Sequence, residues 1–290
     1  MLAPLAAILL TQVSVFETAE PIPLADGYRF TEGPTWVASA KHFVFCDMRG
    51  NTVYQWSGKP DEKPTPFLPE SGAAVGATFG GGRLFLVATA SRSIVSVDAK
   101  GKDLKTVADK LDGKRLGGMN DLAMHKNGSL YVTHGEWFLR PGDKEFDFTG
   151  VLRIAKDGTL SRAAEGIPSP NGICFSPDGK TAFVTEYGPA RILKFSVAAD
   201  GSFKDRALLV DLKALAAEQK IQGGGGADGL RCDAKGRIFA TGPGGVYALD
   251  SAGKFLGHLP MRCTNLALGG PDGKTMLITT GGGVAMVRIK

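Results

Sequence analysis

A short unit recurs six times along the chain, and this repetition restricts the fold more than any other feature of the sequence. Each copy opens with a five-residue frame, passes through a turn and then supplies two apolar segments with the composition of β-strands. The frames are EGPTW from Glu32, VGATF from Val75, NDLAM from Asn120, NGICF from Asn171, DGLRC from Asp228 and TNLAL from Thr264.

Six copies of about 45 residues, each with three or four short strands, are typical of a β-propeller. One small sheet cannot bury both of its faces, whereas sheets packed radially share a continuous core. The repeat therefore predicts an all-β fold, a six-bladed β-propeller that forms a single domain over residues 21–290. We expect residues 22–30, IPLADGYRF, to complete the last blade and close the ring.

Composition agrees with this fold and excludes several classes of partner. Glycine, with 40 of 290 residues, is about twice as frequent as usual, which suits a chain with many tight turns. The net charge is +5, but Lys and Arg alternate with Asp and Glu and form no basic block, so we expect no nucleic-acid partner. Beyond the first residues no apolar run approaches the ~20 residues of a membrane helix, so we expect no membrane partner. The oligomeric state stays open.

Residues 1–20 allow two interpretations. The stretch MLAPLAAILLTQVSVF is apolar, but no basic residue precedes it and no clear A-x-A cleavage site follows it. As a weak signal peptide it would direct the protein to the periplasm or out of the cell. As a disordered or strand-forming N-terminus it would leave the protein in the cytoplasm.

The glycine run at residues 223–226 contains a formal dinucleotide-binding pattern, because Gly224, Gly226 and Gly229 have G-x-G-x-x-G spacing. That pattern binds a pyrophosphate only when a strand precedes it and a helix follows it. Here the order is reversed: residues 211–222, DLKALAAEQKIQ, have the composition of a helix, and strand-like residues follow the glycines. We therefore reject nucleotide binding.

The frames place polar side chains in one register. Equivalent positions of radially arranged blades surround one axis, so Glu32, Asn120, Asn171 and Asp228 are expected to converge at one end of the central channel. Each of these residues could instead cap a turn. However, two carboxylates close together repel each other unless a cation lies between them. Carboxylate and amide oxygens suit calcium, whereas zinc prefers His and Cys, which the frames do not place there.

Longer segments of the chain resemble a known family. They are EGPTW with NTVYQW, MNDLAMHKNGSLYVT, PNGICFSPDGKTAFVTE and ADGLRCDAKGRIFATGPGGVYALDSAGK. Together they resemble the gluconolactonase and senescence-marker-protein-30 family, the regucalcin-like proteins, from about residue 30 to the C-terminus.

The resemblance implies a hydrolase that opens a small, sugar-derived lactone. It implies one divalent cation, bound by Glu32, Asn171 and Asp228, with Asn120 close to the substrate. The cation polarises the lactone carbonyl, and Asp228 is the base that activates the attacking water. Calcium is the expected metal, with zinc, manganese and magnesium as alternatives.

The chain departs from the family at one position that bears on the substrate. Animal members carry an Arg two residues before the substrate-binding Asn, and Gly118 stands there in this chain. Recognition of a sugar acid by that Arg is therefore not supported. The two longest interruptions of the repeat, residues 133–150 and the glycine run, are expected to shape the pocket.

Two further polar residues lie in the third copy of the unit. His134 ends the second strand of its copy, where it either lines the mouth of the channel or is a loop histidine. Asp121, directly after Asn120, is expected to point away from the axis and to be structural.

Two other functions stay open from the sequence. One is a propeller without catalytic activity that binds a protein, peptide or sugar and uses the cation only for rigidity. The other is an enzyme like strictosidine synthase or arylesterase, because similar propellers carry those activities and fold alone does not separate them.

Overall fold

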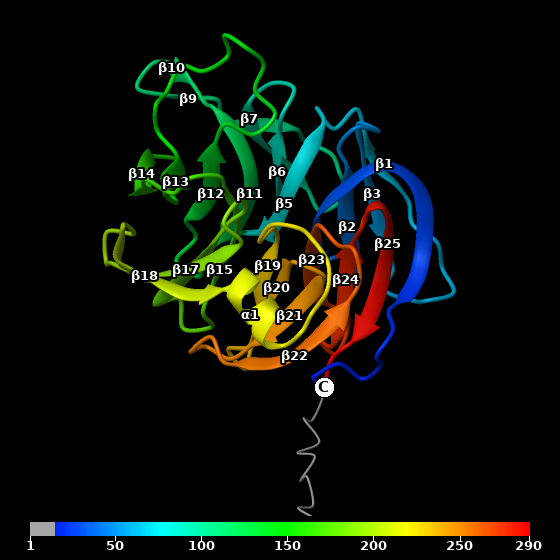
Figure 1. Ribbon diagram of the computed structural model, residues 1–290. Coiled ribbons are helices and arrows are strands. Elements are labelled where there is room, and N and C mark those ends of the chain that lie inside the picture. Colours follow the sequence, from blue (N-terminus) through cyan, green and yellow to red (C-terminus); the bar gives the residue numbers. More distant parts are fainter. Residues whose placement is uncertain (1–14) are drawn as a thin grey trace, which may run out of the picture.

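The computed structural model describes residues 15–290, which form antiparallel sheets arranged around a central axis (Figure 1). Four of these sheets have four strands each, in chain order. They are β5 (Ala74–Gly80), β6 (Arg83–Ala88), β7 (Ser93–Asp98) and β8 (Lys105–Ala108); β11 (Gly118–Met124), β12 (Leu130–Gly135), β13 (Gly150–Ile154) and β14 (Leu160–Glu165); β15 (Pro170–Phe175), β16 (Thr181–Glu186), β17 (Arg191–Val197) and β18 (Phe203–Asp211); and β19 (Leu230–Cys232), β20 (Ile238–Gly242), β21 (Gly245–Leu249) and β22 (Phe255–Pro260).

The fifth sheet joins the two ends of the chain. Its seven strands have the order β23-β24-β25-β1-β2-β3-β4. The long strand β1 pairs with β25 near its start, where Ile22 lies opposite Met286, and with β2 near its end, where Glu32 lies opposite Cys46. Residues 22–26 thus close the ring, as predicted (Figure 1, blue beside red). The strands are β1 (Ile22–Val37), β2 (His42–Asp47), β3 (Thr52–Trp56), β4 (Thr65–Pro69), β23 (Asn265–Gly269), β24 (Thr275–Thr279) and β25 (Gly281–Arg288).

The smaller elements lie between the sheets in the sequence. Strands β9 (Lys110–Leu111) and β10 (Lys114–Arg115) pair with each other. The predicted helix is present as α1 (Leu212–Glu218), shorter than the range 211–222. It begins at Asp211, whose side chain accepts a hydrogen bond from the backbone N–H of Ala214 at 3.0 Å, a typical N-cap.

The prediction of an all-β propeller is confirmed. Residues 15–17 run beside the C-terminus: Glu17 N–H donates to the Arg288 carbonyl at 2.9 Å, and Lys290 N–H to the Val15 carbonyl at 3.0 Å. The signal-peptide and disorder interpretations otherwise concern residues 1–14, which lie outside the described residues. Within residues 15–290 no helix is both long and apolar enough to span a membrane.

Apolar side chains fill the space between neighbouring sheets. Between the sheets that begin with β11 and β15, for example, Tyr131 and Val151 pack with Ile173, Val184 and Leu193, and all five are buried. Such layers fix the position of each blade relative to the next, and they thereby fix the positions of the inner strands around the axis.

Threonine hydroxyls link successive sheets beside the axis. Thr133 donates to the Asn171 carbonyl at 2.6 Å, and Thr185 donates to the Asp228 carbonyl at 2.6 Å. Thr185 also accepts the backbone N–H of Gly172 in its own sheet at 2.7 Å. Each hydroxyl therefore uses both its donor and its acceptor capacity, one within its sheet and one across to the next.

We predict that Thr185→Val destabilises the protein by about 1–3 kcal/mol, because it removes the hydroxyl that accepts the Gly172 N–H and donates to the Asp228 carbonyl, and leaves these two groups only their longer mutual hydrogen bond at 3.2 Å. Thr181→Val, on the same strand but with no side-chain hydrogen bond of its own, should change stability by less than about 0.5 kcal/mol. Urea unfolding of the two variants measures the difference. Equal losses would show that the hydroxyl link contributes nothing particular.

Candidate active site

The polar frame residues lie on the inner strands, at one kind of local irregularity. β1, β11 and β15 each shift register within the frame: between Glu32 and Thr35, between Met119 and Leu122, and between Pro170 and Ile173. Such a bulge turns a side chain out of the regular alternation of a strand. The same irregularity therefore recurs where Glu32, Asn120 and Asn171 stand.

Glu32 is held in a buried position by two hydrogen bonds. Its side chain is buried, and its Oε2 atom accepts the Gly33 N–H at 2.8 Å and the Asn265 amide at 3.0 Å. Burial raises the pKa of Glu32 to about 7, and the charge of Asp121 adds to the increase, whereas the two hydrogen bonds oppose it. Both bonds end on Oε2, so they leave the other oxygen of the carboxylate free of them.

Asp228 follows the glycine run and shares its surroundings with Glu32 and Asn171. Burial raises the pKa of Asp228 well above its usual range, and the charges of Glu32 and Asp121 raise it further. A hydrogen bond from the Asn171 side chain opposes these effects. The structure thus brings Glu32, Asn171 and Asp228 together, although they belong to frames far apart in the sequence.

Asn171 provides the clearest sign of a missing partner. The residue is only 2% exposed, and its Oδ1 atom is buried without a hydrogen bond. A buried acceptor without a partner is unusual in a native protein. In the described part of the chain no three side chains drawn from His, Cys, Asp and Glu are grouped to hold a metal, so a cation here depends on the Asn171 oxygen.

Asn120 lies in the same register of β11 and is buried. No side-chain hydrogen bond connects it with Glu32, Asn171 or Asp228 in the described structure. Of the four predicted residues, Glu32 and Asn171 both act on the pKa of Asp228, so these three form one group. Asn120 occupies the corresponding place on a neighbouring inner strand.

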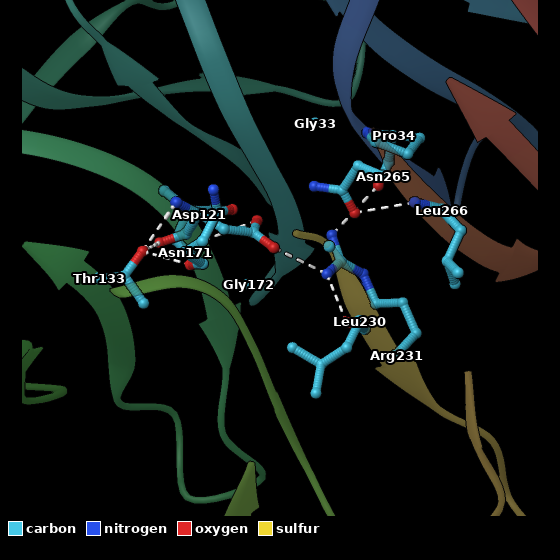
Figure 2. Close-up of polar contacts among 12 residues, drawn as sticks. Gly33, Pro34, Asp121, Thr133, Asn171, Gly172, Leu230, Arg231, Asn265 and Leu266 are labelled. Carbon is cyan, nitrogen blue, oxygen red and sulfur yellow. Dashed lines mark hydrogen bonds and ion pairs between the residues drawn. The ribbon is translucent and has the colours of Figure 1, made fainter. Parts of the chain in front are cut away.

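Sequence reasoning missed Arg231, which forms an ion pair with Asp121 at 2.9 Å (Figure 2). Asp121 is completely buried, and its charge acts on both Glu32 and Asp228. The expectation that Asp121 points away from the axis is therefore not supported, because its charge acts on two acids of other inner strands. Arg231 stands 110 positions from Asp121, and no motif connects the two.

A cavity of about 590 Å³ opens beside Asp228. The glycine run forms one side of it, which confirms the expectation for that segment, and the wall continues with Tyr187 and Arg262. A Cβ atom on Gly226 would clash with the Tyr187 backbone and ring, so only glycine permits this close approach. Within residues 15–290 neither the Tyr187 hydroxyl nor the Arg262 guanidinium has a hydrogen-bond or ion-pair partner.

The other long interruption of the repeat supports this wall from behind. The Trp137 ring meets the Tyr187 ring edge to face, with 5.5 Å between centroids and 89° between planes. Gly118 explains how Trp137 reaches this place, because Gly118 pairs with Glu136 and a Cβ atom at Gly118 would clash with the Trp137 backbone. The segment 136–137 therefore fills the space that any side chain at position 118 would need.

His134 corrects an expectation. It lies within β12 rather than in a loop, and with 1% of its surface exposed it does not line the mouth of the channel. Its Nε2 atom accepts the Gly117 N–H at 2.8 Å, so the proton sits on Nδ1, which donates to the Phe148 carbonyl at 3.1 Å. Burial lowers the pKa of His134 to about 4. A neutral imidazole with both nitrogens engaged is a packing residue.

Known proteins are similar to this chain in sequence and in fold. A family model described as SMP-30/Gluconolactonase/LRE-like region matches residues 30–282. The chain is 29% identical to the gluconolactonase of Zymomonas mobilis, over 96% of this chain and 83% of the relative. It is 24% identical to the pentonolactonase XacC of Haloferax volcanii, over 88% of this chain and 82% of the relative.

A solved structure agrees closely with the fold. The gluconolactonase from Xanthomonas campestris superimposes with a TM-score of 0.84 and 27% identity, covering 96% of this chain and 91% of that one. The relatives named here are lactonases, enzymes that act on cyclic carboxylic esters. With the family model extending over most of its length, the chain belongs to the SMP-30/gluconolactonase/LRE-like family.

Proposed function

We propose that this protein hydrolyses a small sugar-derived lactone with the help of a bound divalent cation. The observation that carries the proposal is the position of Asp228, which is half-buried, is affected by the Glu32 charge and the Asn171 side chain, and lines the 590 Å³ cavity. A small substrate in that cavity would meet the acid directly. Similarity to a gluconolactonase and a pentonolactonase supports a sugar lactone as the substrate class.

The proposal includes a ring of six blades, with the seven-stranded sheet counted as two blades that share β1. Contacts between consecutive frames support this count, because they pass once around the axis and return to the first frame. A Cβ atom on Gly33 would meet the Val75 carbonyl and one on Gly76 the Asn120 carbonyl; Thr133 donates to Asn171, Thr185 to Asp228, Thr241 to Thr264, and Thr264 to Thr31.

The donor set fits a divalent cation held by Glu32, Asn171 and Asp228. The ligands are hard oxygens, one of them the unpartnered Oδ1 of Asn171, so calcium fits best and magnesium or manganese are alternatives. Zinc suits the site less, because the three assigned ligands are oxygens, whereas zinc prefers His and Cys. When bound, the cation would supply Lewis-acid polarisation of the lactone carbonyl and offset the charge that develops on its oxygen.

Asp228 is the general base in this proposal. It takes a proton from water as the water oxygen bonds to the lactone carbonyl carbon. The ring C–O bond then breaks, the ring oxygen takes up a proton, and the product is the open hydroxy acid. The Thr185 hydroxyl and the Gly172 N–H hold the Asp228 backbone carbonyl, so the acid is positioned by its main chain rather than by a flexible loop.

Three further residues are assigned to the substrate. Asn120 supplies an amide at the axis, as the family resemblance implies. Tyr187 and Arg262 line the cavity, and within residues 15–290 neither side chain uses its hydrogen-bond donors, so both are available to the hydroxyl groups of a sugar ring. Together they would orient the ring with its carbonyl towards Asp228.

The test of the proposed function is a panel of aldonolactones, an aryl ester and an indole-alkaloid-type condensation, each with metal-stripped protein and with added Ca²⁺, Mg²⁺, Mn²⁺ or Zn²⁺. We expect hydrolysis of lactones that depends on one of the cations. Turnover of the aryl ester alone would favour the arylesterase-like alternative. Cation binding without turnover of any substrate would favour a propeller that only binds a ligand.

Two substitutions separate the base from the substrate contact. Asp228→Asn keeps an oxygen ligand but removes the base, so kcat should fall by roughly 100-fold or more. Asn120→Ala should mainly raise KM, provided that its contact is equally strong in the ground and transition states. Both are measured at saturating cation. Unchanged turnover in Asp228→Asn would limit this residue to the role of a ligand.

The pH dependence of stability tests the buried acids without substrate. The pKa of Glu32 is raised from 4.5 to about 7 in the folded protein, so its contribution to stability is fully present below pH 4.5 and is lost as the pH rises through 7. The melting temperature of metal-stripped protein should fall over this range more steeply than that of Glu32→Gln. Saturating Ca²⁺ should remove the difference in slope.

The comparison with Glu32→Gln cancels the contribution of His134, whose lowered pKa acts in the opposite direction between pH 6.5 and 4. Parallel pH profiles of wild type and variant in the metal-stripped state would contradict the raised pKa of Glu32.

A further inference from the structure

The second position of the frames is occupied by glycine with two exceptions. Four frames have glycine there, and each of these glycines has backbone or side-chain atoms of another frame within clashing distance of a Cβ atom. Asp121 and Asn265 are the two exceptions. The glycines are Gly33, Gly76, Gly172 and Gly229. An acid at such a crowded and buried position requires a specific partner.

Arg231 is that partner, and hydrogen bonds hold both members of the pair in place. Asp121 Oδ2 accepts Arg231 Nη1 at 2.9 Å, and Oδ1 accepts the Leu122 N–H at 2.8 Å. Arg231 Nη1 also donates to the Leu230 carbonyl at 2.7 Å, and Nη2 to the Pro34 carbonyl at 3.4 Å. The pair therefore joins strands β1, β11 and β19 across the axis (Figure 2).

The pair lies between two openings of the propeller. Arg231 lines a cavity of about 490 Å³ together with Leu122 and Ile173, whereas Asp228 lines the 590 Å³ cavity of the candidate active site. The Arg231 side chain is 17% exposed and Asp121 is not exposed at all. The ion pair thus forms a buried layer beneath the residues assigned to the cation.

The same layer is in electrostatic contact with those residues. The charge of Asp121 acts on Glu32 and on Asp228, and the charge of Glu32 acts on Arg231. The three carboxylates and the one guanidinium carry a formal charge of −2, which a divalent cation neutralises. Without Arg231 the charge would be −3, and without Asp121 it would be −1.

We propose that the Asp121–Arg231 pair is a positioning pair that sets the formal charge of the cation site and so selects a divalent over a trivalent ion. This inference rests on the proposed function, because it takes Glu32, Asn171 and Asp228 as the ligands. Neither member of the pair touches the cation. They act on it through the field of their charges in a poorly solvated channel, where a unit charge has a large effect.

The test is a set of titrations of metal-stripped protein with Ca²⁺ by calorimetry and with Tb³⁺ by luminescence. Asp121→Asn should weaken Ca²⁺ binding by roughly tenfold or more, because the unpaired Arg231 charge then opposes the cation. The double variant Asp121→Asn/Arg231→Met restores the charge of −2 and should bind Ca²⁺ within about threefold of wild type. Recovery in the double variant separates charge from packing, since a structural pair would lose more with each substitution.

A matched control comes from the ion pair of Arg237 with Asp233 at 2.7 Å, in which the Arg side chain is 15% exposed. Arg237→Met removes a comparably buried arginine from the β19–β20 hairpin and should leave the Ca²⁺ affinity unchanged. If Asp121→Asn does not fold, Arg231→Lys and Arg231→Met give the same information. The lysine should keep the preference for Ca²⁺ over Tb³⁺, and the methionine should shift it towards Tb³⁺ by roughly tenfold.

Two results would overturn the inference and point to different causes. If wild type binds Ca²⁺ and Asp121→Asn binds it equally well, or the double variant binds no better than the single one, the pair does not set the charge. If wild type binds neither ion, the cation site itself is absent and the inference falls with it.

Discussion

The close approach of backbones at the axis is the constraint on which the rest of the structure depends. Successive inner strands meet so tightly that a Cβ atom on Gly33 or Gly172 would clash with the carbonyl of the next frame. At one of these meetings the Gly172 N–H donates to the Asp228 carbonyl at 3.2 Å, and the Thr185 hydroxyl reinforces the contact. The candidate ligands are therefore placed by main-chain bonds between blades, which leaves them little freedom to relax apart.

This packing forces acids into a region from which water is largely excluded, and the chain compensates each of them differently. Glu32 receives two hydrogen bonds on one oxygen, and Asp121 receives a guanidinium. Within residues 15–290, Asp228 has only the Asn171 amide to lower its pKa, and the Asn171 Oδ1 atom has no hydrogen-bond partner. The polar groups that lack a compensating interaction are thus the Asn171 oxygen and the Asp228 carboxylate, and a cation bound between them would supply it.

The repeat made much of this arrangement predictable. The recurrence of the frames placed Glu32, Asn171 and Asp228 in one register, because a propeller converts a sequence repeat into rotation about an axis. The ion pair of Arg231 was not predictable, since its partner Asp121 lies in another frame and an Arg in a strand has many possible partners. His134 was misjudged for a related reason: its two ring nitrogens are bonded to the Gly117 N–H and the Phe148 carbonyl, and no motif in the sequence connects His134 with either residue.

Substrate recognition follows a different rule from the axis. The frames fix where the candidate ligands stand, whereas the loops decide what surrounds them. At Gly118 the absence of a side chain admits the backbone of residues 136–137, and Trp137 then supports the Tyr187 ring at the cavity wall. Position 118 therefore has no room for a positively charged side chain. The positively charged side chain that lines the cavity, Arg262, comes from the loop between β22 and β23. Under the proposed function, a lactone would therefore meet a positive charge from this loop rather than from β11, and the contacts that select the substrate would differ although the axis is the same.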